Sequence, residues 1–396
     1  MFSTTDEKFH AKLRRAVSNA YAMSTLVQFE SLVDSTTLAF LEQLEERFAD
    51  KTGPQGICDF SKWLQFYEFD VIGELTYSKR LGFVDRGVDI DGIIGNLEWL
   101  LNYAAIVGQI PILDRVFLKN PLRLFASQVG LISSNTSVAT FARDRIARRE
   151  GVEHAEEKPA TISGKKGTRR DFLSRFTEAH HKDPEFITRE RVVALTVANM
   201  FAGSDTTAIS LRAIFYFLLR TPEDMDGLMK ELWAQRENGI FSDPNGLVNW
   251  NDKLFAATLL RGLTLERIVP RQGVTICGKW IPGGTIVGCS AWTVHRDSLF
   301  GPDTGTFRPR RWLEASPEQK RQMDSSLFTF GAGSHTCIGK NISFLEMYKL
   351  VPALLMRFEI EFADPTKPWK VHNAWFVKQS EFKVYLRRRS KEQNLI

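Results

Sequence analysis

The chain has 396 residues, of which 43% are hydrophobic and 25% are charged. These proportions are typical of a globular protein and exclude a wholly disordered chain, a collagen and a disulfide-rich scaffold. Lys and Arg number 52 and Asp and Glu 47, and this small basic excess is spread along the chain. A nucleic-acid-binding protein would show a concentrated basic face, so we expect no nucleic-acid partner.

The four cysteines are too few and too scattered for a disulfide framework or a zinc site. This usage is typical of a reducing compartment, or of one that faces it. The first thirty residues contain no apolar stretch that fits a signal peptide. No run reaches the roughly 18 to 20 apolar residues of a membrane-spanning helix. The sequence as it stands therefore predicts no membrane crossing.

Helical spacing of apolar residues dominates the first two thirds of the chain. It predicts helices over 6–22, 24–49 and 60–78, with others between 90 and 149. The polar, charge-mixed stretch 148–170 contains glycines and a proline, and it predicts a mobile surface loop. Because helical spacing resumes directly after it, this loop is not expected to separate two domains.

The clearest predicted helix begins after Thr188, a good N-cap residue, with Glu190 in its first turn. Apolar residues continue from Val192 to about Leu219 on nearly all sides. A helix that is apolar all round must be buried, so we expect it to cross the whole domain. Thr221 and Pro222 then predict the cap and first residue of the next helix.

The character changes in the last third. Segment 267–290 has β-branched residues, alternation and a Pro-Gly-Gly turn, which predict a short hairpin. A helix is expected over 338–358, and strand-like alternation returns over 358–386. The fold class is therefore mostly α with small β-sheets, and residues 1–396 are expected to form a single domain.

The most informative segment runs from Phe330 to Gly339 and reads Phe-Gly-Ala-Gly-Ser-His-Thr-Cys-Ile-Gly. Its glycines let the backbone come close to something flat and bulky. Cys337 lies at the start of the predicted helix, where free N–H groups and the positive helix end favour a thiolate. A thiolate in such a turn suits an axial ligand of haem iron. The alternative is a buried and inert cysteine.

This decapeptide resembles the haem-binding loop of the cytochrome P-450 family, the haem-thiolate monooxygenases. The resemblance implies a cytochrome P-450-like fold, a haem-binding loop at 330–339 and haem b with its iron held by the Cys337 thiolate. It places a basic residue at His335 to meet a haem propionate. The other fixed positions of the loop, implied to bind the cofactor, are Phe330, Gly333 and Gly339.

The segment Ala202 to Thr207 lies in the middle of the long helix and resembles the oxygen-activation motif of the family. An acid beside an alcohol, Asp205 and Thr206, can relay protons. Ala202 and Gly203 are small and are expected to leave room for oxygen and substrate. In the alternative interpretation Thr206 bonds back to the preceding helical turn and Asp205 reaches a surface partner.

Three basic positions resemble those that bind haem propionates in the family. His10 and Arg14 match the pair on an early helix, and Arg267 matches an arginine on a strand. The planar guanidinium of Arg suits a carboxylate. Segment 307–312 resembles the segment before the haem loop, with Arg311 at the arginine that locks the proximal side. The alternative for each is an ordinary solvated basic residue.

The chain departs from the family pattern at two places. The Glu-x-x-Arg pair expected on a helix before the 267–290 hairpin is missing from segment 249–267. Losing partners from a buried ion network is costly, so we expect a different proximal side or a deletion. The likeness also starts at the helix with His10, so the family fold is expected to be incomplete at the N-terminus.

The resemblance implies a monooxygenase of the type found in filamentous-fungal secondary metabolism, acting on a lipophilic molecule such as a terpenoid or polyketide. Oxygen and electrons from NADPH through cytochrome P-450 reductase are implied, with docking at basic residues. Full-length relatives are expected at the cytosolic face of the endoplasmic reticulum membrane, and membrane association here requires an N-terminal anchor. The residues expected to contact substrate are Leu263, Leu265, Trp375 and Phe376, besides those around Met200–Ser204, and the residues expected at the reductase face are Lys12, Arg14, Arg15 and Lys340.

Two alternatives stay open at this point. The missing Glu-x-x-Arg pair and N-terminal part favour an inactive or haem-free remnant of such an enzyme. A haem protein that catalyses isomerisation or reduction, without monooxygenation, is the other.

Overall fold

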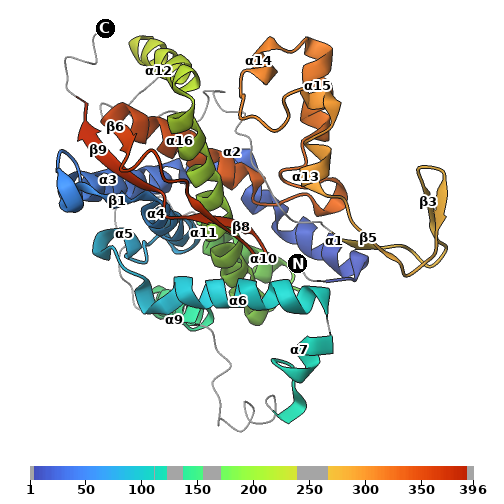
Figure 1. Cartoon of the computed structure of the whole chain (residues 1–396). Helices are drawn as coiled ribbons and strands as arrows, with labels where there is room; N and C mark the ends of the chain where they lie inside the picture. Colours follow the sequence, from blue (N-terminus) through green and yellow to red (C-terminus); the bar gives the residue numbers. More distant parts are fainter. Residues whose placement is uncertain (1–3, 111, 123–136, 155–170, 239–265, 390–396) are drawn as a thin grey trace.

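The computed structural model describes residues 4–110, 112–122, 137–154, 171–238 and 266–389 (Figure 1). Long helices fill the centre of the molecule, and the strands form small sheets around them. One two-stranded hairpin extends away from the body, at the right of Figure 1. The predicted fold class, mostly α with small β-sheets, is confirmed.

The N-terminal helices follow the prediction with breaks that packing explains. The predicted helix 60–78 is confirmed, whereas the predicted helix 24–49 is split by a 3-10 turn at Val27–Phe29. Leu26, just before that turn, and Phe29, its last residue, are fully buried, so tertiary packing overrides the helical spacing there. The helices are α1 Glu7–Val17, α2 Met23–Leu26, α3 Glu30–Arg47, α4 Phe60–Tyr77, α5 Phe83–Arg86, α6 Ile93–Gln109, α7 Ile112–Val116 and α9 Ser137–His154.

The predicted loop 148–170 was wrong at its start, because α9 continues to His154. The guanidinium of Arg149 forms an ion pair of 2.5 Å with the buried carboxylate of Asp171. The same guanidinium donates to the backbone carbonyl of Tyr77 at the end of α4. These contacts hold the last turns of α9 against the core. The remainder of the predicted loop, 155–170, lies outside the described residues.

The long central helix is confirmed. Its N-cap is Thr188, whose hydroxyl accepts from the backbone N–H of Arg191, as predicted. Pro222 takes the first position of the next helix, also as predicted, but the Thr221 hydroxyl donates to the Phe217 carbonyl instead of capping that helix. The helices are α10 Phe172–Lys182, α11 Arg189–Arg220 and α12 Pro222–Glu237.

The last third alternates short helices and strands. The predicted hairpin is confirmed as two nested antiparallel pairs, β2 with β5 and β3 with β4. A three-stranded sheet has the order β1-β9-β6, and β7 pairs with β8. The helices are α13 Ala291–Val294, α14 Arg311–Glu314, α15 Pro317–Ser326 and α16 Lys340–Arg357; the strands are β1 Cys58–Asp59, β2 Arg267–Ile268, β3 Val274–Ile276, β4 Lys279–Ile281, β5 Ile286–Val287, β6 Phe358–Phe362, β7 Lys370–Asn373, β8 Val377–Ser380 and β9 Lys383–Arg388.

The core is built where α4, α11 and α16 meet. Every residue of α4 except Lys62 is buried, and α11 packs along it. A Cβ at Gly203 would lie 2.9 Å from the side chain of Ile72, so this glycine lets the two helices approach closely. Burial of large side chains such as Phe66 and Phe69 stabilises this contact by roughly 1.5 to 3 kcal/mol each.

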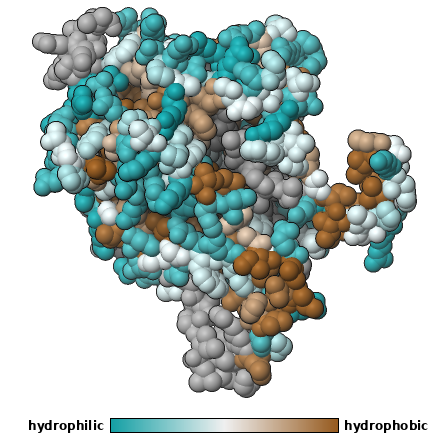
Figure 2. All heavy atoms as spheres, in the orientation of Figure 1, coloured by the Kyte–Doolittle hydropathy of each residue, from teal (hydrophilic) through white to brown (hydrophobic). Residues whose placement is uncertain are grey.

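Within the described residues, α11 is long and apolar enough to span a membrane, but it is a core helix with 56% of its apolar window buried. Apolar side chains also gather on the surface, over the outer side of α6 and α7 and on the β3–β4 hairpin (Figure 2). Those on the first patch are Trp99, Ile106, Ile110, Ile112, Val116 and Phe117, and those on the hairpin are Val274, Ile276 and Trp280.

Candidate active site

The loop that carries Cys337 is shaped by its glycines. Gly331 and Gly333 have φ of 70° and 71°, a left-handed conformation that favours glycine. The backbone N–H of Cys337 donates to the carbonyl of Phe330 at 2.8 Å, which closes the loop. Cys337 is half-buried, and its sulfur lies 4.0 Å from where a Cβ at Gly339 would be. The loop therefore presents a sulfur atom beside a bare backbone.

Two imidazole rings lie beside this loop. His10 of α1 stacks on His335, with ring centroids 3.9 Å apart. Burial, together with the charge of His335, lowers the pKa of His10. The carboxylate of Glu7, one turn before His10, lies 3.0 Å from Nε2 of His335. Arg14 is one turn beyond His10 on the same face of α1. Thus the structure brings His10 and His335 together and adds Glu7 to them. The sequence could have indicated Glu7, because it lies one helical turn before His10.

The central helix is not buried on all sides, which corrects the prediction. Ala194, Ala198 and Ala202 are exposed at four-residue intervals, and Thr206 is half-exposed on the same face. Open space therefore lies along the middle of α11. Small side chains on this face leave room for a flat ligand.

The residues expected around Met200–Ser204 divide between this open face and the core. Met200 and Ser204 are buried, and the Ser204 hydroxyl donates to the Met200 carbonyl, so neither lines the open face. Gly203 faces α4, where an added Cβ would meet the side chain of Ile72, so its small size serves the packing of the two helices. Ala202 is the member of the group that faces the open space.

The acid and the alcohol point in different directions. Asp205 is buried, and one of its oxygens accepts from the Gln65 amide of α4 at 2.9 Å. The Thr206 hydroxyl donates to the Ala202 carbonyl at 2.8 Å, as the alternative interpretation predicts. The oxygen of that hydroxyl remains half-exposed on the open face and can still accept a hydrogen bond.

The open face of α11 is joined to the cysteine loop through α16. The hydroxyls of Thr207 and Ser343 lie 3.1 Å apart, and Ser343 is in the first turn of α16, just after the loop. Tyr21 donates to the Asn199 side chain on α11 at 2.5 Å, and its carbonyl accepts from Asn341. These contacts fix the half-exposed cysteine and the half-exposed threonine on neighbouring elements.

The other predicted site residues are less closely placed. Arg267 donates to the adjacent Glu266 carbonyl, and within the described residues no hydrogen bond or ion pair joins it to the two histidines. Trp375 and Phe376 form the turn between β7 and β8, and the Trp375 ring lies against Gly108 of α6. The predicted substrate residues Leu263 and Leu265 lie outside the described residues.

Arg311, whose usual Glu-x-x-Arg partners were expected and not found in the sequence, has other partners. Its guanidinium donates to the carbonyls of Phe300, Asp303 and Thr306, and the Asp303 carboxylate lies 3.5 Å away. The side chain is only 8% exposed. The side chain of Arg311 thus holds the segment before the cysteine loop by binding backbone carbonyls of that same segment. Most of the segment from which the pair is missing, 249–265, lies outside the described residues.

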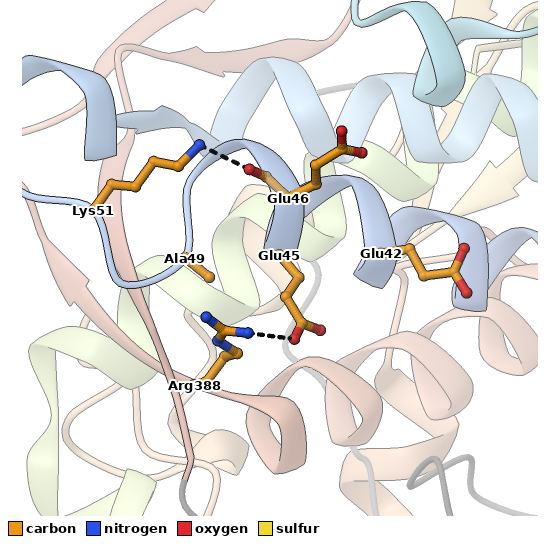
Figure 3. Close-up of a pocket in the computed structure, with 6 residues that line it drawn as sticks. All are labelled: Glu42, Glu45, Glu46, Ala49, Lys51 and Arg388. Carbon is orange, nitrogen blue, oxygen red and sulfur yellow. Dashed lines mark hydrogen bonds and ion pairs between the residues drawn. The ribbon is translucent and has the colours of Figure 1, made fainter.

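A surface recess elsewhere on the molecule is lined by none of the candidate site residues. It lies where α3 ends beside β9 (Figure 3). Both of its cations are already engaged, since Arg388 pairs with Glu45 at 3.2 Å and Lys51 donates to the Glu46 carbonyl. The residues that line it are Glu42, Glu45, Glu46, Ala49, Lys51 and Arg388.

Two carboxyl groups meet in the core behind the site, which sequence patterns did not indicate. Glu68 of α4 and Glu346 of α16 are both fully buried, and their carboxyl groups are close enough for the charge of Glu346 to act on Glu68. Burial raises the pKa of Glu346 to about 8. Burial and the neighbouring charge of Glu346 raise the pKa of Glu68 well above its usual range. The pair therefore keeps a proton at neutral pH.

We expect the folded chain to lose stability between pH 4.5 and 8 because of Glu346. In the unfolded chain this carboxyl ionises near pH 4.5, whereas in the fold it keeps its proton to about pH 8. Within that window unfolding releases a proton, so raising the pH lowers the unfolding free energy by up to about 1.4 kcal/mol per pH unit. In urea unfolding measured across this pH window, the unfolding free energy should fall less steeply with pH for Glu346→Gln, because its amide cannot ionise.

The exposed Glu185 provides the control for this experiment. Glu185→Gln should follow the wild-type pH dependence. If Glu346→Gln did so as well, the carboxyl would not carry the extra proton.

Comparison with known proteins tests the resemblance. The model of the family described as "Cytochrome P450" matches residues 2–239 and 260–386 of the chain. The chain is a cytochrome P-450. The match omits 240–259, which includes part of the segment that lacks the Glu-x-x-Arg pair. Members of this family bind haem through a cysteine thiolate and act as monooxygenases.

Fungal relatives support the same assignment for this cytochrome P-450. It is 42% identical to a "Cytochrome P450 monooxygenase" of Aspergillus terreus, over 91% of this chain and 73% of that protein. It is 38% identical to "Cytochrome P450 monooxygenase cicH" of Emericella nidulans, over 98% of this chain and 77% of that protein. The crystal structure of the cytochrome P450DA heme domain shares the fold, with a TM-score of 0.72, 17% identity and coverage of 96% of this chain and 77% of that one.

The residues of this cytochrome P-450 fit a haem. The half-buried sulfur of Cys337 stands in a glycine loop, where nothing lies within 4 Å of a Cβ placed at Gly333. A soft thiolate is one of the ligands that hold haem iron. The open face of α11, marked by Ala198 and Ala202, leaves space for a flat macrocycle. The pair of imidazoles offers nitrogen donors for its carboxylates.

Proposed function

We propose that this chain is a haem-thiolate monooxygenase that oxidises a lipophilic small molecule, a fungal secondary metabolite such as a terpenoid or polyketide. The observation that carries the proposal is the half-buried Cys337 in its glycine loop, next to the helix that packs on the Thr206 turn of α11. The fungal origin of the monooxygenases that the chain resembles supports the substrate class.

The geometry of the loop supports the proposed cofactor-binding roles. The Cys337 thiolate would hold the iron of haem b, and a bound thiolate-ligated haem supplies electron density that favours cleavage of the O–O bond. His10, His335 and Arg14 would bind the propionates, because they lie together at the edge of the cysteine loop. Arg267 would join them from β2. Phe330, Gly333 and Gly339 shape the loop, as described above.

Asp205 and Thr206 would move protons to the site. Thr206 presents its hydroxyl oxygen on the open face of α11, and Asp205 is the adjacent buried acid. A positioned acid and alcohol can transfer a proton without free water at the reacting centre. The buried surroundings of Asp205 keep bulk water from the carboxylate.

Substrate and electrons would reach the site from different sides. The turn with Trp375 and Phe376 would contact substrate, together with Leu263 and Leu265. NADPH–cytochrome P-450 reductase, with acidic groups at its contact face, would dock near Arg14, Arg15 and Lys340. Lys12 contributes less, since it forms an ion pair of 3.2 Å with Asp183. Full-length relatives would carry out this reaction at the endoplasmic reticulum membrane.

The experiment that tests the function uses the purified chain with haem, NADPH, reductase, isotopically labelled oxygen and a panel of lipophilic terpenoids and polyketides. The expected result is a product that contains one atom from labelled oxygen, formed only when NADPH is present. A chain that takes up no haem would support the inactive remnant instead. A product without labelled oxygen would support isomerisation or reduction, and either result would overturn the proposal.

A further inference from the structure

The carboxylate of Asp205 is held at one oxygen only. Its Oδ1 accepts from the Gln65 amide at 2.9 Å, whereas Oδ2 has no hydrogen-bond partner among the described residues. The side chain is 1% exposed. A buried carboxylate oxygen without a hydrogen-bond partner lowers the stability of the fold. Stability therefore does not explain this arrangement of Asp205.

Gln65 fixes which oxygen of Asp205 is held. Its own Oε1 accepts from two cations, Arg212 at 3.1 Å and Lys378 at 3.2 Å. An amide oxygen between two cationic donors cannot exchange places with its NH2 group, so the NH2 group must point at Asp205. Arg212 is itself anchored, since it donates to the Ser61 carbonyl. The free oxygen of Asp205 is therefore set by a rigid contact of α4.

Lys378 connects this buried group to the surface. Its side chain is 18% exposed, its Nζ lies 4.0 Å from Oδ1 of Asp205, and it forms an ion pair with Glu98 of α6. The Glu98 side chain is 46% exposed. In Figure 1, β8 crosses α11 beside α6, so three elements meet at this point. The cations Arg212 and Lys378 balance the charges of the carboxylates Asp205 and Glu98. Of these groups, the Glu98–Lys378 ion pair faces solvent.

We propose that Gln65 and Lys378 are positioning residues for Asp205, and that the Glu98–Lys378 ion pair is the solvent gate of its proton supply. When the pair opens, water enters beside the carboxylate of Asp205 and relays a proton from bulk solvent to its free oxygen. A hydronium ion gives up the proton and remains as a water molecule, so that only O–H bonds form and break. The inference rests on the proposed role of Asp205 as a proton donor.

The same hairpin supplies a matched control. Lys370 of β7 also forms a hairpin ion pair, at 2.6 Å with Glu381, and its side chain is 71% exposed. Lys370→Met therefore removes a lysine and an ion pair without touching Asp205. Gln65→Leu and Lys378→Met remove the two contacts of interest.

The test measures kcat, KM and the share of consumed oxygen released as hydrogen peroxide, in the haem-loaded chain. Charge-assisted hydrogen bonds are worth roughly 1.5 to 3 kcal/mol, so kcat should fall about 10- to 100-fold in Gln65→Leu at unchanged KM. The peroxide share should rise in Gln65→Leu and in Lys378→Met, but not in Lys370→Met. If both test variants matched Lys370→Met while Asp205→Asn was slow, this inference would fail and the role of Asp205 would stand.

A second measurement needs no turnover. In urea unfolding of the chain, the effects of Gln65→Leu and Asp205→Leu should be non-additive by more than about fivefold in the unfolding equilibrium constant, because either leucine removes the buried bond from the Gln65 amide to Oδ1 of Asp205. Additive effects would contradict the positioning role. If instead Asp205→Asn left kcat unchanged while this coupling was observed, the proposed function of Asp205 would fail, and the proton path with it.

Discussion

Cys337→Ser is expected to reduce turnover by at least roughly three orders of magnitude, the scale seen when a group that acts directly at a reacting centre is removed. The hydroxyl of serine is a poor iron ligand compared with a thiolate, so the proposed axial ligand is lost. The fold should survive, because the bond that closes the loop is made by the backbone N–H of residue 337 to the Phe330 carbonyl. Product formation and the urea unfolding midpoint separate the two effects.

Cys289→Ser is the matched control for that experiment, because Cys289 is an exposed free cysteine. It should leave product formation and the unfolding midpoint unchanged. Turnover at the wild-type rate in Cys337→Ser would show that the reaction does not need this sulfur.

Asp205→Asn and Thr206→Val should each lower kcat by about a hundredfold, the low end of the range for a positioned acid or base. Neither change adds volume to the core, and Asn keeps an oxygen that can accept from the Gln65 amide. Among the described residues, the bond that the Thr206 hydroxyl donates goes to the Ala202 carbonyl of its own helix, so its loss should not unfold α11. KM should stay close to the wild-type value, since the proton is needed only after substrate binds.

Ser210→Ala provides the comparison on the next turn of α11. Its hydroxyl donates to the Thr206 carbonyl, so it tests whether any lost hydroxyl in this helix slows the reaction. We expect kcat to change less than threefold, the equivalent of about 0.6 kcal/mol. Equal losses in Ser210→Ala and Thr206→Val would argue for a structural effect.

The parts of the molecule that sequence predicted best are local. The N-cap at Thr188, the first residue Pro222 and a hairpin over 267–290 are set by short patterns of residues, and all three are confirmed. The cysteine loop belongs with them, because its glycines and Cys337 are neighbours in the sequence. Neighbouring residues are enough to predict the structure where a single turn or helix cap sets the geometry.

What could not be predicted depends on contacts between distant segments. Periodicity showed α11 to be apolar all round, and only the fold reveals that the face with Ala198 and Ala202 lies open. Gln65 and Lys378 meet Asp205 from α4 and β8, and no motif marks either residue. Such pairings are decided by the packing of whole elements, which a single sequence does not display.

The carbon monoxide difference spectrum of the reduced, haem-loaded wild-type chain tests the central claim most directly, namely that this chain holds haem through the thiolate of Cys337. The predicted result is a Soret band at the long wavelength typical of thiolate-ligated haem, with one haem bound per chain. A band at the shorter wavelength typical of a neutral axial ligand, or a chain that retains no haem, would contradict the account.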